Sequence, residues 1–193
     1  MPQQKSKKIF LYFFIFLMIG TFNNRNLKEN EIFRINRIDL IGLKGDKKIR
    51  LVNELNSLGM KNILFLKENK IKKIINTNNE IEQFSIFKKY PSSLDIKIEK
   101  AKFLAQIKKD GKNYFLGSNK KLIKSSKLSK DIPFIFGDFK VENFFSLKNA
   151  LDKTNFDYKL IDKLFFFKSG RWDIEMISGS LIKLPKDNLN SSL

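Results

Sequence analysis

Two residue types that carry much of enzyme chemistry are missing: the 193 residues include no histidine and no cysteine. Without histidine there is no Ser-His-Asp triad, no histidine general base and no histidine metal ligand. Without cysteine there is no disulfide, zinc ribbon, iron–sulfur cluster or thiol nucleophile. A cysteine-free chain is compatible with an oxidising compartment but does not indicate one.

Other catalytic patterns are absent or weak. The acidic residues are scattered singly, so no acid–base dyad is visible, and the 9 glycines are isolated, so no phosphate-binding loop forms. A Ser-x-x-Lys spacing at 85–88 lies in a predicted strand rather than at the start of a helix, which indicates chance. The sequence therefore predicts a protein that is not an enzyme, with no catalytic residue, cofactor or metal.

The composition that remains is globular, with 42% hydrophobic and 30% charged residues, enough for one ordinary domain or two small ones. The net charge of +18 is typical of nucleic-acid-binding proteins. However, only 5 of the 38 basic residues are arginine, which leads direct readout of bases, and the lysines are spread along the chain. This pattern favours the codon bias of an AT-rich genome over a specific nucleic-acid surface.

A basic nucleic-acid-associated protein stays open as an alternative function. Aromatic side chains between exposed cations can stack on single strands. Against this, Phe14, Phe84, Phe144, Phe166 and most other phenylalanines are predicted to face a core.

Residues 9–22 form an uncharged run behind three lysines, and three interpretations compete for it. A helix of this length rises only about 21 Å, short of a ~30 Å hydrocarbon core. A cleaved signal peptide is disfavoured because no cleavage site with small residues follows the run. A buried core helix is disfavoured because it would be amphipathic, whereas this run is apolar on all sides. We expect a transmembrane anchor over 9–24, lengthened by Lys8 and by interfacial Asn23 and Asn24, with residues 1–8 as a cytoplasmic tail.

Residues 31–100 predict an α+β unit in the order strand, helix, helix, strand, strand. A turn at Gly42 precedes the first helix, Asp46 is its expected cap and Gly59 its end. Residues 62–66 are expected to be a short buried extended piece. The other elements are a strand over 32–41, a helix over 68–76, and strands over 81–89 and 94–99 joined by a turn at 90–93.

Residues 84–100, FSIFKKYPSSLDIKIEK, resemble the hairpin of the POTRA domain in the bacterial cell-division family FtsQ, called DivIB in other lineages. The shared features are an apolar pair, a basic residue, an aromatic-Pro pair, a leucine and an acidic–basic exit. The matching positions are Tyr90, Pro91, Leu94, Glu99 and Lys100, and residues 38–42, ending in Gly42, resemble the family's first strand and glycine turn.

This chain departs from the family pattern at four positions without changing the core pattern. Lys100 replaces an arginine, Lys102 a proline, Leu104 an alanine, and Lys67 an acidic helix cap. A POTRA-bearing envelope-assembly protein is a further alternative.

Residues 101–193 predict a mostly antiparallel β domain with one helix, over 141–153. The stretch 132–137, with Pro133 and Gly137, resembles a segment of the second, β domain of FtsQ proteins, as do the strands around Trp172 and 181–185. A three-residue loop at 178–180 is expected to set Ile182 opposite Met176 and Leu184 opposite Ile174. The predicted strands cover 103–107, 113–116, 121–123, 161–168, 171–177 and 181–184.

The resemblance implies a non-enzymatic, single-pass scaffold that links early and late division proteins at the septum of the inner membrane, with its bulk in the periplasm. It implies that the β domain binds the FtsB–FtsL pair and that the POTRA domain binds other division proteins. Only eight residues follow Pro185, so we expect an apparently truncated domain with one unpaired sheet edge, open to strand addition. The candidate partner-facing edge consists of Arg171, Trp172, Ile174, Ile182 and Leu184.

Overall fold

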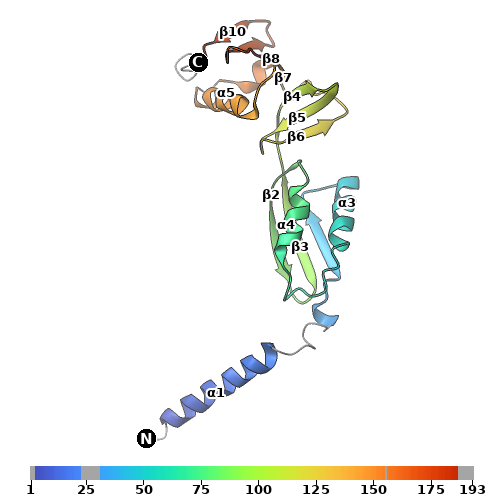
Figure 1. Ribbon diagram of the computed structural model, residues 1–193, viewed down its shortest axis with the longest axis vertical. Coiled ribbons are helices and arrows are strands. Elements are labelled where there is room, and N and C mark those ends of the chain that lie inside the picture. Colours follow the sequence, from blue (N-terminus) through green and yellow to red (C-terminus); the bar gives the residue numbers. More distant parts are fainter. Residues whose placement is uncertain (1–2, 23–30, 155, 187–193) are drawn as a thin grey trace. The chain divides into compact units, whose positions relative to one another are not determined.

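The computed structural model describes residues 3–22, 31–154 and 156–186. The chain divides into two units, one formed by residues 1–77 and 84–98, the other by residues 78–83 and 99–193. Each unit combines helices with one β-sheet (Figure 1). The predicted α+β class is therefore confirmed for the described residues.

Helix α1, Gln3–Phe22, contains the apolar run of the amino terminus. It begins with six polar residues, and its large apolar side chains from Ile9 to Ile19 are exposed. No helix among the described residues is long and apolar enough to cross a membrane. The expected transmembrane anchor over 9–24 includes residues 23 and 24, which lie outside the described residues, so the anchor stays a prediction.

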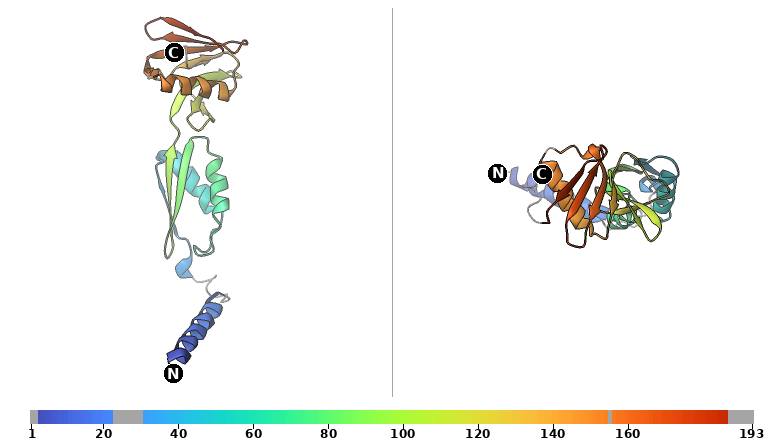
Figure 2. Two further views of the ribbon diagram at one scale, coloured as in Figure 1. Left: turned by 90° about the vertical axis from the view of Figure 1, so that its left-hand side faces the viewer. Right: turned by 90° about the horizontal axis from the view of Figure 1, so that it is seen from above.

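The first unit contains a three-stranded sheet in the order β1 (Arg37–Ile41), β3 (Ser93–Lys100), β2 (Ile81–Lys89). Helices α3 (Gly45–Asn56) and α4 (Glu68–Asn76) cover one face of it (Figure 2). Strands β1 and β3 are parallel, so the chain needs a crossover between them, and the helices supply it. The core consists of buried residues from all these elements, among them Leu40, Leu51, Leu55, Ile63, Ile71, Ile75, Leu94 and Ile96.

The predicted order of the first unit is confirmed, and α4 and β2 have the predicted bounds. The predicted first strand is too long, because residues 31–33 form a short 3-10 helix, η1 (Glu31–Phe33). Asp46 does not cap α3, which begins after Lys44 without a side-chain cap, and α4 likewise begins after Lys67 without one.

The expected extended piece over 62–66 is wrong. Here the Asn62 side-chain oxygen accepts a hydrogen bond from the Leu64 N–H at 2.9 Å, which closes a turn. Ile63 is buried, whereas Leu64 and Phe65 are 40% and 50% exposed. In this segment a local side-chain hydrogen bond therefore forms in place of strand pairing.

The second unit contains a seven-stranded sheet in the order β10-β9-β8-β7-β4-β5-β6. Helix α5, Val141–Lys153, packs on one face through Phe144, Leu147 and Leu151 (Figures 1 and 2). A 3-10 helix, η2 (Tyr158–Leu160), precedes β8. The strands are β4 (Phe103–Lys109), β5 (Lys112–Gly117), β6 (Leu122–Ser125), β7 (Phe134–Phe136), β8 (Ile161–Phe166), β9 (Trp172–Met176) and β10 (Leu181–Leu184).

The sheet is mostly antiparallel, as predicted, but β7 is parallel to both β4 and β8. The β7–β8 pair is parallel because α5 carries the chain back across the sheet between them. Helix α5 has the predicted bounds.

The predicted register of the last hairpin is wrong by two residues. Ile182 pairs with Ile174 and Leu184 with Trp172, because the N–H of Met176 bonds the carbonyl of Ser180 and the loop is 177–179. A shift of two residues keeps every side chain on its predicted face. The apolar pairing across this hairpin is therefore as expected, although the partners differ.

Candidate partner-binding edges

Strand β10 is the last strand at one end of the described seven-stranded sheet. The N–H of Met176 donates to the carbonyl of Ser180 at 2.9 Å, which fixes the direction of the main-chain groups at the start of the hairpin. These directions alternate along an antiparallel strand. The N–H and C=O groups of Leu181 and Lys183 therefore point away from β9, toward the open edge.

The side chains of the predicted edge residues lie mainly inside the unit. Trp172, Ile174 and Leu184 are buried, and Ile182 is half-buried against the same core. The Trp172 ring lies 5.8 Å from the Phe139 ring. Because β9 is flanked by β8 and β10, the edge at this end of the sheet, among the described strands, is the main chain of β10.

Arg171 forms an ion pair with Asp173 on the sheet face opposite α5. Its Nε lies 3.0 Å from Oδ1, its Nη2 donates to Oδ2 at 3.2 Å, and its guanidinium lies 4.7 Å from the Phe167 ring. The Asp173 side chain is 6% exposed, so Arg171 neutralises a nearly buried carboxylate. Arg171 thus stabilises β9.

Gly42 and Gly137 each follow a strand that runs parallel to a neighbour, and both adopt a φ above +100°. A Cβ at Gly42 would lie 1.9 Å from the carbonyl oxygen of Ile98, and one at Gly137 would lie 2.1 Å from that of Phe166. No side chain fits at either position. The two glycines therefore permit close packing of neighbouring backbone and are structural residues.

The other family-motif positions divide between turn, core and surface. Tyr90 and Pro91 form the exposed β2–β3 turn, and the peptide bond between them is cis. Leu94 lies fully in the core, whereas Lys100 is exposed. Glu99 accepts a hydrogen bond from Gln83 at 2.6 Å.

Pro133 is buried, and its carbonyl accepts a hydrogen bond from the N–H of Gln106 at 2.9 Å. The Gln106 side chain also bonds the carbonyls of Ser129 and Ile132. These contacts hold the segment before β7 against β4, so Pro133 has a structural role here.

Two titratable side chains in the second unit have shifted pKa values. Burial raises the pKa of Tyr158, with a smaller contribution from Asp152, and its hydroxyl donates to the carbonyl of Leu104 at 2.8 Å. The pKa of Lys163 is raised by hydrogen bonds to Glu175 first and Asp162 second. The first shift reflects the burial of Tyr158 in the unit, and the second reflects an exposed ion-pair cluster on the sheet.

Sequence reasoning missed a group of phenylalanines on the sheet face opposite α5. The rings of Phe134 and Phe165 lie 4.6 Å and 5.2 Å from the ring of Phe136, and Phe103 stacks on Phe115 at 4.7 Å. Phe103 and Phe136 are each 42% exposed. The expectation that most phenylalanines face a core is wrong for these residues and for the exposed Phe14, whereas Phe144 is buried as expected.

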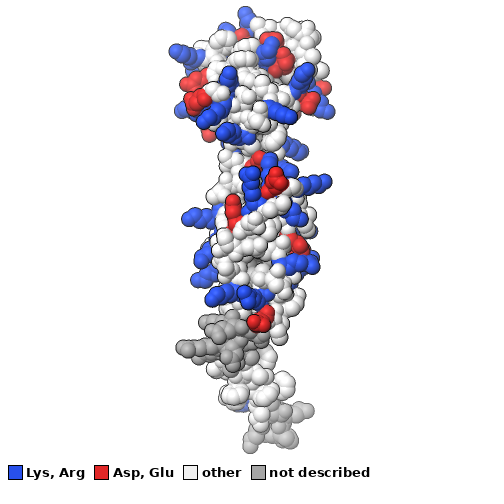
Figure 3. Space-filling view, turned by 90° about the vertical axis from the view of Figure 1, so that its right-hand side faces the viewer, with Lys and Arg blue, Asp and Glu red and all other residues white. Residues whose placement is uncertain are grey.

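Lysines and arginines are spread over the surface of each unit rather than gathered in one patch, on the face that Figure 3 shows. Within the described ranges, no three side chains of the metal-binding types come together. Among the described residues, neither unit presents a recognisable reaction centre. The edge strands of the two sheets are the candidate binding features of the chain.

The fold defines a two-unit α+β chain with open sheet edges, and comparison with known proteins adds little to that description. No family model matches the chain, and no curated protein matches it. One solved structure with some likeness is the major extracytoplasmic domain of the bacterial cell-division protein DivIB, in its trans isomer, from Geobacillus stearothermophilus. The match has 10% identity and a TM-score of 0.38, and covers 49% of this chain and 86% of that one. A likeness of this size carries no argument about function.

Proposed function

We propose that this chain is a scaffold protein of bacterial cell division that binds partner proteins by strand addition at its open sheet edges. The proposal rests on the strand–helix–helix–strand–strand order of the first unit, with its Tyr90–Pro91 turn, and on the likeness of these residues to the FtsQ pattern. In this role the chain catalyses no reaction and instead positions other proteins. The FtsB–FtsL pair is the proposed partner of the second unit.

The observation that carries the proposal is the open edge of β10. Leu181 and Lys183 direct their main-chain groups outward, and an added strand can bond to them. The same strand is anchored to the core by the fully buried side chain of Leu184, which pairs with the buried Trp172 of β9. A preordered edge loses little conformational entropy on binding, which favours affinity.

Proline substitution at the edge tests this proposal. Lys183→Pro removes an outward N–H and leaves the bonds to β9 in place, because proline is tolerated on edge strands. Lys183→Ala is the matched control, since it removes the same charge and keeps the N–H. We expect the proline variant to bind the organism's own FtsB–FtsL pair at least about tenfold more weakly than wild type, and the alanine variant within about threefold.

Emission from Trp172, the single tryptophan, verifies that each variant is folded. Equal binding by the proline variant and wild type would show that β10 is not the docking edge. No binding by any form would overturn the proposed function itself.

The location of the chain stays a prediction, with residues 25–193 outside the cytoplasm and the first eight residues inside. The absence of cysteine makes the test clean, because any introduced thiol is unique. A cysteine at the exposed position Ser126 should react with a membrane-impermeant maleimide in spheroplasts, and one at Ser6 should not. The reverse labelling would refute this location.

A second candidate function is binding of single-stranded nucleic acid, and the exposed phenylalanines opposite α5 favour it. Base–aromatic stacking contributes about 1–3 kcal/mol per base. Asp173 and Glu175 lie on the same face and form ion pairs with Arg171 and Lys163, so these two cations are already engaged. Binding of a labelled oligonucleotide that persists at 200 mM salt and falls in Phe136→Ala would support this function, whereas loss of all binding between about 50 and 200 mM salt indicates nonspecific contact.

A further inference from the structure

The first unit contains a hollow of about 460 Å³ beside the start of α4, and its lining includes no strand residue. The loop after α3 and the first turn of α4 form its walls. Its centre is apolar, from Leu58, Met60 and Leu66, and methionine is a side chain that adapts to irregular partners. The size is typical of pockets that bind a small ligand or a few anchoring side chains.

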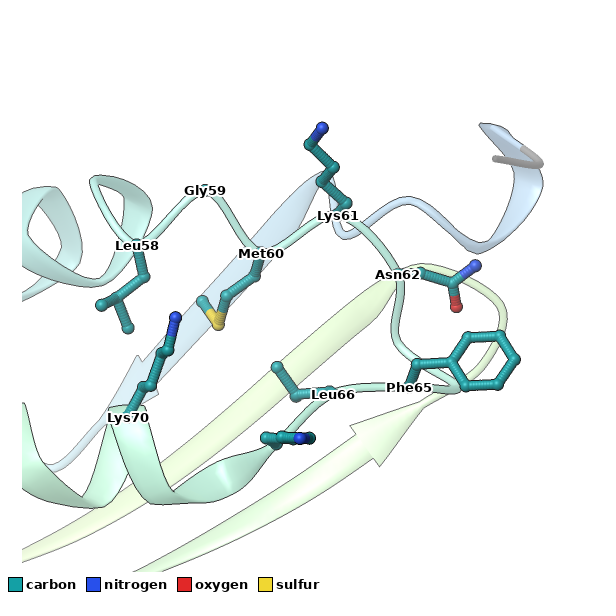
Figure 4. A pocket seen from close by; sticks show the side chains of 9 residues that line it. Leu58, Gly59, Met60, Lys61, Asn62, Phe65, Leu66 and Lys70 are labelled. Atoms are coloured by element: carbon teal, nitrogen blue, oxygen red, sulfur yellow. The ribbon is translucent and has the colours of Figure 1, made fainter. Parts of the chain in front are cut away.

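The charged residues of this hollow are all cations. Lys61, Lys67 and Lys70 line it, and no aspartate or glutamate does. Figure 4 shows Lys70 pointing toward Met60, while Lys61 points away from the centre on the opposite rim. An apolar centre therefore lies between cations on two sides.

The larger hollow of the second unit, about 890 Å³, is not lined by charges of one sign. Its walls carry three lysines and three acidic residues, so their charges balance, and nothing in its lining selects a partner. The charged residues in its lining are Lys108, Lys109, Lys140, Asp110, Asp138 and Glu142.

We propose that the hollow beside α4 binds an acidic peptide segment of a partner protein, with one or two large apolar side chains flanked by carboxylates. The apolar side chains fill the centre, where burial of apolar area stabilises the complex. The flanking carboxylates meet the lysines on the two rims, which gives orientation and a faster association rate. A single phosphate or lipid headgroup fits less well, because Lys61 and Lys70 lie on opposite rims and do not converge on one point.

The test uses the full chain in a nonionic detergent and three fluorescein-labelled peptides. The first contains Glu-Glu-Leu-Phe-Glu-Glu, the second replaces glutamate by glutamine, and the third replaces Leu-Phe by Ser-Ser. We expect fluorescence anisotropy to show binding of the first peptide, and at least about tenfold weaker binding of each of the others.

Charge-reversal variants locate the binding. Lys67→Glu with Lys70→Glu should weaken binding of the first peptide at least about tenfold. Lys48→Glu with Lys73→Glu changes the net charge equally at exposed positions outside the hollow, and should change it less than about threefold. If the glutamate pair at 67 and 70 unfolds the chain, alanine at both positions tests the same point.

Three outcomes would overturn the proposal. Equal losses in the two charge-reversal pairs would show nonspecific attraction by net charge. Undiminished binding of the Ser-Ser peptide would show that the apolar centre is not used. Binding of anionic vesicles that depends on Lys67 and Lys70, without binding of the first peptide, would assign the site to lipid. The β10 variants test the other unit, so this proposal and the proposed function can fail independently.

Discussion

Replacing Gly137 by alanine should separate two costs that glycine avoids, backbone strain and steric exclusion. A non-glycine residue with positive φ costs about 1–2 kcal/mol. At Gly137 the new Cβ would also lie 2.1 Å from the carbonyl oxygen of Phe166, whereas real Cβ atoms essentially never lie within 3.0 Å of such an atom. Relief requires β7 and β8 to move apart, which weakens ladder hydrogen bonds worth about 1 kcal/mol each. We expect a total loss of about 3 kcal/mol in the free energy of unfolding.

Gly179→Ala is the matched control in the same unit. Gly179 also has a positive φ, +87°, but nothing lies within 4 Å of a Cβ built there. This variant should lose only about 1 kcal/mol. Equilibrium urea unfolding, followed by the emission of the buried Trp172, reports on this unit directly. With a slope of about 1.5 kcal/mol/M, the midpoint should fall by about 2 M for Gly137→Ala and by less than about 1 M for the control. Equal shifts would refute the argument from close packing at Phe166.

Three further predictions concern packing within each unit, one in the first unit and two in the second. Gly42→Ala should destabilise the first unit by about 3 kcal/mol and Gly45→Ala, which has open space, by about 1 kcal/mol, measured by amide hydrogen exchange in the strands of that unit. Because burial raises the pKa of Tyr158 above 10.0, its contribution to stability is present below pH 10 and is lost as the pH rises further. Tyr158→Phe should therefore be about 1 kcal/mol less stable than wild type at pH 7, through the lost hydrogen bond, and this difference should shrink above pH 10 in urea titrations. Arg171→Met should cost about 2 kcal/mol in thermal unfolding, because Asp173 is left nearly buried without its partner, and Arg171→Lys should recover part of that loss.

The sequence predicts the elements of this chain well wherever apolar spacing decides them. Helix α5 and helix α4 have the predicted bounds because their apolar residues recur with a helical period and pack on a sheet. The 62–66 turn was missed because it depends on one side-chain hydrogen bond, from the Leu64 N–H to Asn62. Such local bonds leave no periodic signal in the sequence.

The two strands of the candidate edge could be predicted from the sequence, but which of them forms the edge of the sheet could not. Alternation around Trp172 and Leu184 correctly predicts two strands with a shared apolar face. Which strand is the last in the sheet depends on contacts among segments distant in sequence, and no local pattern contains that information. The hollow beside α4 was likewise not predicted, because it is created by the turn at 62–66 and by the way α3 and α4 pack.

The loop at 177–179 constrains how this part of the chain can change in evolution. Sliding β10 along β9 by two residues keeps Ile182 and Leu184 on the core side. A slide of one residue would turn both side chains outward and place Lys183 opposite the tryptophan. Relatives of this protein should therefore change the length of this loop only where the added or lost residues leave the strand pairing unchanged or shift it by two.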